Sequence, residues 1–310
     1  MPDEEQALPN DVRKNPAANE PDESDEPIWE GQIYTNEDGT RRVLRRRPPL
    51  LEVEDLYVQF GDHQVLRNIN LQIRKGETVA IIGESGCGKT VLLKTIIGLI
   101  RPTFGRVFLD GQDMSEFSGR ALSQARTRFG FVFQQAALFD SMTIGQNIAF
   151  PILQKNPKTK RSEIKETTHR LLHEVGLTSD IESRMPAELS GGMRKRVGFA
   201  RALAISPEVM LYDEPTTGLD PIMSDVINEM IINARDKHKV TGVLVTHDMK
   251  SAKKVADRIV MFYPNSRLDP SEPQMIFDGT PDEIEASEDT RVWQFINGFA
   301  GERLMEMTEG

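Results

Sequence analysis

The segment TVAIIGESGCGKT, residues 78–90, constrains the fold of this chain more than any other. A short apolar run leads into a glycine-rich turn, and KTVLLKTI after the turn has the apolar spacing of a helix. The turn matches the pattern G-x-x-x-x-G-K-[ST], in which backbone N–H groups converge on phosphate oxygens. The order of strand, glycine loop and helix therefore predicts a phosphate-binding loop in an α/β fold.

The side chains of this loop have separate expected roles. Lys89 places a positive charge on the β- and γ-phosphates of a nucleotide, and the hydroxyl of Thr90 is a ligand for Mg²⁺. Cys87 is expected to be a small filler, although alkylation of its thiol would block the site. The predicted nucleotide-binding residues are Gly83, Glu84, Ser85, Gly86, Cys87, Gly88, Lys89 and Thr90.

Polar residues also follow other predicted strands. VMLYDEP places Asp213 and Glu214 at the carboxyl end of a strand, where ligands bind in open α/β sheets. Asp213 is expected to hold Mg²⁺, and Glu214 to activate a water for attack on the γ-phosphate. Gln134 follows FGFVF and can reach Mg²⁺ or that water. His247 follows GVLVT and can contact the γ-phosphate, although a structural histidine is an alternative.

A second anion site is predicted at ELSGGMRKRVGFARAL, residues 188–203. Ser190 can cap the helix that starts here, and Gly191 and Gly192 let another group approach the backbone closely. The basic residues 194–196 follow at once, so positive charge surrounds a helix N-terminus. This local pattern does not by itself identify the anion.

The alternation of strands and helices from residue 50 onward predicts an α/β domain with a largely parallel sheet. LEVEDLYVQF and QVLRNINLQI alternate apolar and polar residues, and GRVFLDGQDM has the pattern of a hairpin. We expect residues 48–282 to form this domain, with a helical subdomain at about 136–188. Residues 283–310 are expected to form a C-terminal helical tail.

Residues 1–47 have the composition of a disordered acidic tail, because they are too poor in apolar residues to offset chain entropy. The tail ends in the basic run RRVLRRRPP. This run fits a solvated linker, and it also fits a contact with anionic lipid head groups.

Charge and composition exclude several classes of protein. A net charge of −10 argues against a general nucleic-acid binder, and a single cysteine excludes an intrachain disulfide framework and suits a reducing compartment. The N-terminal MPDEEQALPN lacks the apolar core of a signal peptide, and the chain has no apolar run of about 18 residues. Any action at a membrane is therefore expected to depend on a partner.

The motifs GESGCGKT, FVFQQ, LSGGM, VMLYDEP, TGLDP and VTHD occur in this order, and together they resemble the ATP-binding-cassette (ABC) ATPases. The resemblance covers roughly residues 50–263. It implies a P-loop cassette with a RecA-like parallel-sheet core, an antiparallel β subdomain and a helical subdomain, with ATP and Mg²⁺ as cofactors. The implied catalytic residues are Glu214, His247, Lys89 and Gln134, and the implied metal ligands are Thr90, Gln134 and Asp213.

The same resemblance implies a homodimer. In this family two cassettes pair head to tail, so Ser190, Gly191 and Gly192 would contact the γ-phosphate of the ATP held by the partner. Asp220 would lie on the loop that links the two sites. Phe60 would stack on adenine, although an aromatic residue in a strand also fits a core position. Met193 stands where the family usually has Gln, so a side-chain amide contact is lost there.

Shorter segments resemble a subfamily. LSGGMRKR, ALFDSMTIGQNIAFPI and RVWQFING are similar to the ATPase subunits of Mla-type phospholipid transporters, which belong with Mce-associated systems. The resemblance implies an integral membrane permease, an Mce-type lipid-binding protein, no nucleic acid, and a place on the cytoplasmic face of the inner membrane. Leu138, Phe139, Met142, Ile144 and Phe150 form an apolar set that is expected to supply both core and permease contacts.

Other functions stay open at this point. An importer of a polar solute, such as an amino acid, would use the same cassette, because the permease and binding partner select the substrate. A soluble ABC ATPase acting on ribosomes or DNA is disfavoured by the single cassette, the lack of a long coiled coil and the acidic charge. An ATP-binding scaffold without hydrolysis is disfavoured by Glu214 and His247 together.

Overall fold

The computed structural model describes residues 32–35, 41–44 and 49–299. The chain divides into two units, residues 1–47 and 48–310. In the first unit, strand β1 (Gln32–Thr35) pairs antiparallel with β2 (Arg41–Leu44). This pair was not expected in a tail predicted to be disordered, and the rest of that tail lies outside the described residues.

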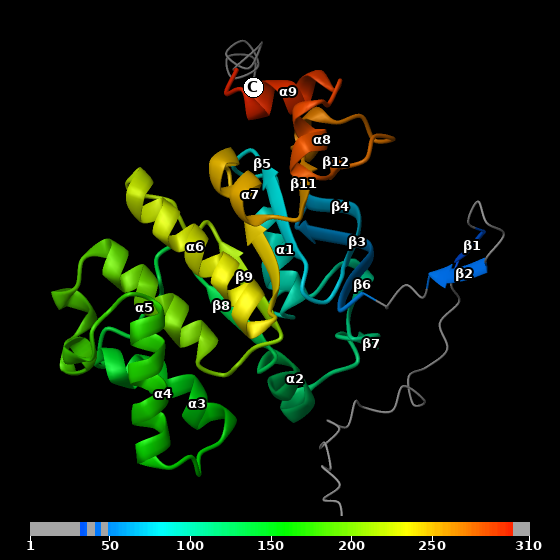
Figure 1. The fold of residues 1–310 in the computed structure, drawn as a ribbon. Coiled ribbons are helices and arrows are strands. Elements are labelled where there is room, and N and C mark those ends of the chain that lie inside the picture. Colours follow the sequence, from blue (N-terminus) through cyan, green and yellow to red (C-terminus); the bar gives the residue numbers. More distant parts are fainter. Residues whose placement is uncertain (1–31, 36–40, 45–48, 300–310) are drawn as a thin grey trace, which may run out of the picture. The chain divides into compact units, whose positions relative to one another are not determined.

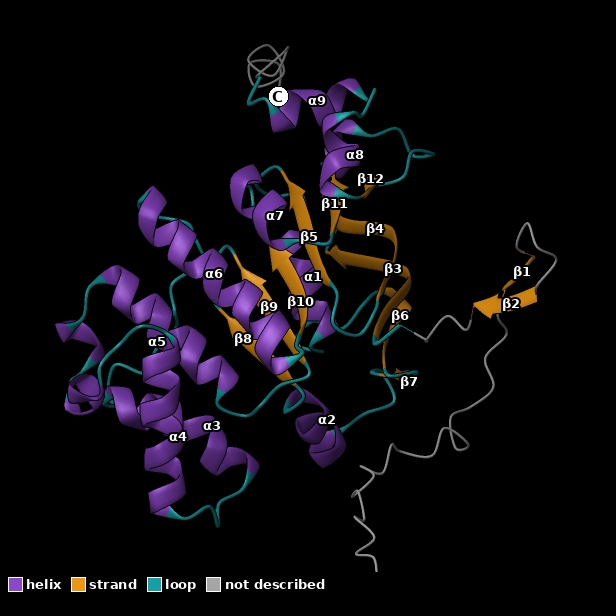
Figure 2. Cartoon of the chain, in the orientation of Figure 1, coloured by secondary structure: helices purple, strands orange, loops and turns teal. Residues whose placement is uncertain are grey.

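The second unit is built on a six-stranded sheet (Figures 1 and 2). Neighbouring strands run parallel, except that the edge strand β12 is antiparallel to β11. In spatial order the strands are β12 (Met275–Gly279), β11 (Arg258–Phe262), β5 (Thr78–Gly83), β10 (Thr241–Val245), β9 (Val209–Asp213) and β8 (Phe129–Val132). The predicted parallel sheet is confirmed.

A second, antiparallel sheet contains the strands predicted from the alternating segments. Its order is β4 (His63–Ile73), β3 (Leu51–Phe60), β6 (Phe104–Leu109) and β7 (Gln112–Asp113). The antiparallel β subdomain is therefore present.

Two hydrophobic clusters cover the two faces of the parallel sheet. In β5, Val79 and Ile81 face helix α1 (Lys89–Ile96) and the antiparallel sheet, whereas Ala80 and Ile82 belong to the opposite cluster. This alternation follows from the two-residue period of a strand. Helices α5 (Gly191–Leu203), α6 (Pro221–His238) and α7 (Met249–Val255) pack on the second face.

The helical part of the unit contains α3 (Ile144–Lys155), α4 (Arg161–Glu174) and the 3₁₀ turns η2 (Ser179–Ser183) and η3 (Pro186–Glu188). Helix α3 begins with a capping box formed by Thr143 and Gln146. Helix α5, which follows the expected limit at residue 188, packs on α3 and α4 and also on β8, so it joins the helical part to the parallel sheet. Helix α2 (Gly119–Arg126) lies apart from this group, between β7 and β8.

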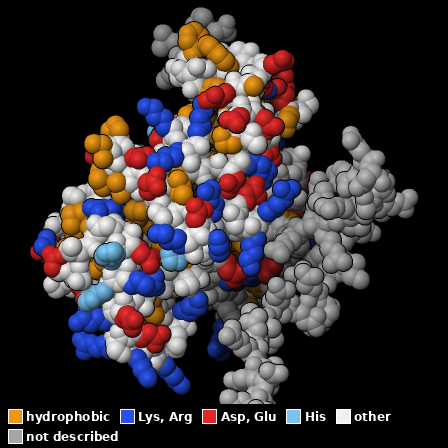
Figure 3. Space-filling view, in the orientation of Figure 1, with side chains coloured by type: hydrophobic (Ala, Val, Ile, Leu, Met, Phe, Trp, Pro, Cys, Tyr) orange, Lys and Arg blue, Asp and Glu red, His pale blue; other side chains and the backbone are white. Residues whose placement is uncertain are grey.

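The C-terminal segment is part of the same core. The boundary expected between residues 282 and 283 falls inside α8 (Pro281–Glu285), and α9 (Thr290–Ile296) follows. Ile284 and Val292 are fully buried in the cluster that contains α5 and α6, so this segment packs on its own cassette. Trp293 and Phe299 stay exposed at the end of α9, where Figure 3 shows hydrophobic side chains gathered.

No helix within the described residues is long and apolar enough to cross a membrane.

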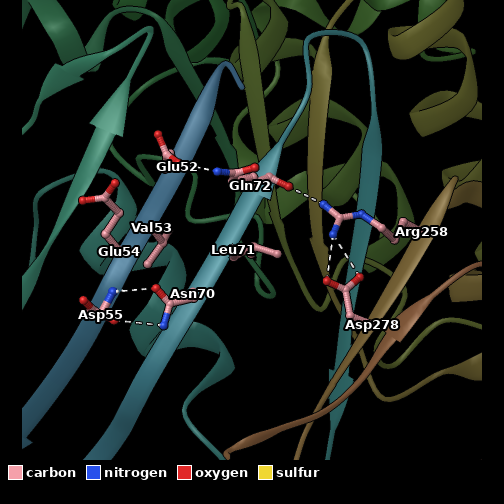
Figure 4. A pocket seen from close by; sticks show the side chains of 9 residues that line it. All are labelled: Glu52, Val53, Glu54, Asp55, Asn70, Leu71, Gln72, Arg258 and Asp278. Carbon is pink, nitrogen blue, oxygen red and sulfur yellow. Dashed lines mark hydrogen bonds and ion pairs between the residues drawn. The ribbon is translucent and has the colours of Figure 1, made fainter. Parts of the chain in front are cut away.

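Arg258 joins the two sheets (Figure 4). Its guanidinium donates to the Gln72 carbonyl oxygen in β4, to Glu77 at 2.8 Å and to both oxygens of Asp278 in β12 at 2.9 Å. The other carboxylates around this hollow are also paired, for example Glu52 with the Gln72 amide. The hollow is therefore a structural ion-pair network, in which one arginine holds the antiparallel sheet against the edge of the parallel sheet.

Arg258→Met is expected to lower the free energy of unfolding by about 2 kcal/mol, because it leaves the mostly buried Glu77 carboxylate without its arginine. Thermal denaturation measures the effect. Arg106→Met is the matched control, since its partner Glu54 is exposed and such pairs contribute roughly 0–1 kcal/mol. Equal losses in both variants would contradict the role of Arg258.

Candidate functional site

The loop of residues 83–90 connects β5 to α1, as predicted. Gly83 has φ +146°, and a Cβ atom there would lie 2.3 Å from the Phe262 carbonyl oxygen. Gly88 has φ +97°, and its Cβ would lie 2.7 Å from the Leu66 side chain. Only glycine fits either position, because the backbone conformation and the neighbouring atoms both exclude a side chain.

Lys89 is held inside this loop. Its ammonium group donates to the carbonyl oxygens of Gly83 and Glu84, both at 2.8 Å, and the side chain is largely buried. The Lys89 ammonium group lines the cavity, so it can donate to phosphate oxygens in place of these carbonyl oxygens.

A cavity of about 540 Å³ lies in front of the loop. It is lined by nine of the predicted residues: Phe60, Ser85, Gly86, Gly88, Lys89, Thr90, Gln134, Glu214 and His247. Phe60 is half exposed, so the face of its ring is available for stacking rather than packed in the core. Residues that follow β5, β8, β9 and β10 therefore meet at one site with Phe60 of the antiparallel sheet.

Two of the three predicted Mg²⁺ ligands lie in contact with each other. The Thr90 hydroxyl donates to Asp213 Oδ1 at 2.8 Å, and Asp213 ends β9 with only 7% of its surface exposed. Burial raises the pKa of the Asp213 carboxyl, and the hydrogen bond from Thr90 opposes that shift. A hydroxyl in contact with a buried carboxylate is a pair of oxygen donors that suits Mg²⁺, and Gln134 lines the same cavity as Thr90.

Glu214 and His247 form a pair at the cavity wall. His247 Nδ1 lies 2.8 Å from Glu214 Oε2, and the Thr217 hydroxyl donates to the same oxygen at 3.0 Å. Glu214 has φ +49°, and its N–H donates to the Val245 carbonyl oxygen of β10 at 2.9 Å. These contacts fix the carboxylate at the end of β9, where it can accept a proton from a water.

The predicted second anion site is not part of this cavity. Ser190 caps α5 by accepting a hydrogen bond from the Met193 N–H at 3.3 Å, and Ser190 and Gly191 are exposed. Asp220 caps α6 by accepting from the N–H groups of Ile222 and Met223. Within one chain these residues do not meet the phosphate loop, and their helix starts are open to another molecule.

Several loop residues of the predicted nucleotide-binding set do not line the cavity. Cys87 is buried, and burial raises the pKa of its thiol, so it acts as a filler and alkylation is disfavoured. The Glu84 carboxylate is paired with Arg267 at 2.9 Å. Gly83 is packed against Phe262.

Some neighbours of the site were not predicted. Val65 and Val91 line the cavity. The Lys195 ammonium donates to the carbonyl oxygens of Pro215 and Thr217, at 2.9 and 2.6 Å, and so links α5 to the loop after Glu214. Its position in the basic run of residues 194–196 was the only sequence signal for it.

Asp213→Asn is expected to raise the melting temperature at neutral pH. The raised pKa of Asp213 means that the folded chain disfavours the ionised carboxylate. The resulting loss of stability grows as pH rises from the pKa of this carboxyl in the unfolded chain to its higher pKa in the folded chain. Asparagine carries no charge and removes this loss. Mg²⁺-dependent hydrolysis should fall by at least about 100-fold, since even outer-shell partners of a metal contribute roughly 10–100-fold. Asp225→Asn, at an exposed pair, is the control. Unchanged hydrolysis would remove Asp213 from the metal site.

Comparisons with known proteins agree with this geometry. A family model described as ABC transporter matches residues 66–217. The chain is 37% identical over 249 residues to the intermembrane phospholipid transport system ATP-binding protein MlaF of Haemophilus influenzae, covering 80% of this chain and 90% of MlaF. It is 38% identical over 248 residues to Mkl of Mycobacterium leprae, described as a probable ribonucleotide transport ATP-binding protein, covering 80% of this chain and 69% of Mkl.

A solved structure has the same fold. A dimeric ATP-binding cassette in a post-hydrolysis state, bound to ADP and Pi, superposes with a TM-score of 0.66 at 30% identity, covering 74% of this chain and 98% of that one. The motifs, the cavity and these similarities together show that the chain belongs to the ABC transporter family as an MlaF-like, ATP-binding ATPase subunit.

Proposed function

We propose that this ATPase energises phospholipid transport through a separate membrane permease. The observation that carries the proposal is the match to MlaF over 90% of that protein, combined with a cavity that brings the phosphate loop, Gln134, Glu214 and His247 together. The cavity supports hydrolysis of ATP, and the relative supports the class of substrate that hydrolysis would move.

The chemistry follows from the contacts in the cavity. Thr90, Asp213 and Gln134 would hold Mg²⁺, which neutralises the phosphate charge when it is bound. Glu214 would take the proton of the attacking water. His247, at 2.8 Å from that carboxylate, would hold it in position and contact the γ-phosphate. Phe60 would stack on the adenine from the antiparallel sheet.

A dimer would complete the site. Ser190 and Gly191 are exposed at the start of α5 and lie outside the cavity of their own chain, so their N–H groups are available to a phosphate on a second copy. The similar dimeric cassette bound to ADP and Pi supports this assembly. Met193 would leave the backbone contact with phosphate in place, although its side chain lacks the amide of the usual Gln. Asp220 would lie on the loop between the two sites.

The permease contact would involve Phe139, of which 40% is exposed. Its ring lies 4.9 Å from the Phe150 ring, and the Arg201 guanidinium lies over it at 5.6 Å. Ile144 of the same apolar set is fully buried, so the set divides into core and contact residues. The proposal places the protein on the cytoplasmic face of the membrane through this permease, with an Mce-type lipid-binding protein as a further partner.

Import of a polar solute is the second candidate. The similarity to Mkl, whose description names ribonucleotide transport, favours it. Both candidates use the same ATP site, because a cassette does not itself select the substrate.

The dimer can be tested with two variants that damage different halves of one site. Lys89→Ala removes the positive charge that would contact the phosphates. Gly191→Asp places a negative charge at the start of α5, where a Cβ atom meets no neighbouring atom within 4 Å. Each variant alone is expected to be inactive in an ATPase assay. Mixed dimers contain one intact site, so an equimolar mixture should regain about a quarter of the wild-type rate. No gain on mixing would contradict action across the dimer.

The substrate class can be tested by detergent purification of the complex from its native membrane, followed by mass spectrometry of its proteins and lipids. Phospholipid transport predicts a multi-spanning permease, an Mce-like protein and enriched phospholipid. A permease with a soluble solute-binding protein and no enriched lipid would instead support the polar-solute importer. Recovery of ribosomes or DNA without a membrane protein would contradict transport.

A further inference from the structure

The loop between β11 and β12, residues 263–274, lies against the phosphate loop. It contains the 3₁₀ turn η4 (Asn265–Arg267) and ends in Gln274, whose side chain is fully buried. A fully buried glutamine next to a ligand-binding loop is unusual, because its amide must find partners within the protein.

Gln274 makes three hydrogen bonds. Its Oε1 accepts from the Arg67 N–H at 2.8 Å, and its Nε2 donates to the carbonyl oxygens of Val65 at 3.0 Å and Cys87 at 2.9 Å. Both amide hydrogens are therefore used, one on the phosphate loop and one on a residue that lines the nucleotide cavity. Cys87 is in the phosphate loop, and Val65 lines the cavity on the side of the antiparallel sheet.

The two groups joined by Gln274 are already close to each other. The Val65 carbonyl oxygen lies 3.0 Å from the position of a Cβ on Gly88, so β4 and the phosphate loop approach as closely as their backbones permit. Asn265 of the same β11–β12 loop adds a donor to the Val65 oxygen at 3.0 Å. Small movements of either backbone would change the direction of the loop N–H groups that face the cavity.

Arg267 makes a second link from the β11–β12 loop. Its guanidinium lies 2.9 Å from a carboxylate oxygen of Glu84, the second residue of the phosphate loop. This pair is only partly exposed, with 27% of the Arg267 side chain and 17% of the Glu84 side chain accessible. The phosphate loop is therefore held at Glu84 and at Cys87 by one external segment.

The β11–β12 loop is itself anchored. The Arg67 guanidinium donates to the carbonyl oxygens of Asp269 and Glu272, at 2.9 and 2.6 Å. Arg291 at the start of α9 donates to the Glu272 carboxylate at 3.0 Å. These contacts tie the segment to β4 and to the C-terminal helix, so it can act as a fixed support.

We propose that the β11–β12 loop is a positioning element for the nucleotide, with Gln274 as its central residue. Gln274 does not touch the nucleotide. It sets the distance between the Cys87 peptide and the Val65 wall, and thereby preorganises the N–H groups that bind phosphate. This inference rests on the ATP site described above and adds residues outside its motifs.

Gln274→Met tests the proposal, because methionine has nearly the same volume and removes all three hydrogen bonds. In the full-length protein, the Kd for ADP is expected to rise about tenfold, since a binding loop that is no longer preorganised must be ordered on binding. The KM for ATP should rise in parallel, and kcat at saturating ATP should stay within about twofold, because Glu214 and the metal ligands are untouched.

Asn147→Leu is the matched control. Asn147 is also a fully buried amide with every hydrogen bond made, but its partners are Phe139, Met142 and Thr143 in the helical part of the chain. The Asn147→Leu variant should have a lower melting temperature, as Gln274→Met should, but an unchanged Kd for ADP.

Gln274→Glu separates hydrogen bonding from packing. A carboxylate faces the carbonyl oxygens of Val65 and Cys87 and repels them, whereas a protonated carboxyl regains one donor. Relative to wild type, its affinity for ADP should therefore improve as pH falls.

Two results would overturn the role of the loop: a Kd within twofold of wild type in Gln274→Met, or no pH difference between Gln274→Glu and wild type. Absence of ADP binding in the wild-type protein would instead overturn the nucleotide site itself.

Discussion

The burial of β5 between β11 and β10 is the constraint on which the nucleotide cavity depends. All six residues of β5 are buried, and the parallel register places Gly83 beside Phe262, and Val245 beside both Ile81 and Asp213. The carboxyl ends of these strands therefore end at one edge. The phosphate loop follows β5, Asp213 ends β9, Glu214 follows it, and His247 lies just beyond β10. These groups therefore meet at one edge of the sheet although they are far apart in the sequence.

This arrangement buries the charged groups of Lys89 and Asp213, which lowers the stability of the folded chain. Lys89 satisfies its charge with two carbonyl oxygens of its own loop, and Asp213 has only the Thr90 hydroxyl as a hydrogen-bond donor among its side-chain partners in the described chain. Burial raises the pKa of Asp213, which shows that the folded protein disfavours its charge. A bound cation would offset this penalty, because a ligand that binds only the folded state adds to its stability.

Support for the site comes from segments that carry no motif. Lys195 holds the loop after Glu214, Arg258 joins the two sheets, and Gln274 holds the phosphate loop. Each uses a long side chain to reach backbone carbonyl oxygens of a distant segment. Single-sequence patterns do not reveal such contacts, because the partner lies from 20 to 187 residues away and has no required residue type.

Boundaries were the least predictable feature. The expected break at 282/283 divides α8, because the apolar residues Ile284 and Val292 complete a core that began much earlier in the chain. The limit expected at residue 188 precedes α5, a helix that packs both on α3 and on β8. Burial of apolar residues against distant elements therefore blurs both limits.

The sequence by itself determined the strand–loop–helix unit, the alternating strands and the identity of the polar residues at strand ends, because these follow from local periodicity and from glycine and lysine chemistry at fixed spacing. It also predicted a second anion site at the Ser190 helix start, separate from the phosphate loop. Only the tertiary structure decided that Phe60 faces the cavity, that Cys87 is inaccessible and that Gln274 supports the nucleotide loop. Those outcomes depend on which distant backbones pack together, and burial between distant segments has no local pattern in the sequence.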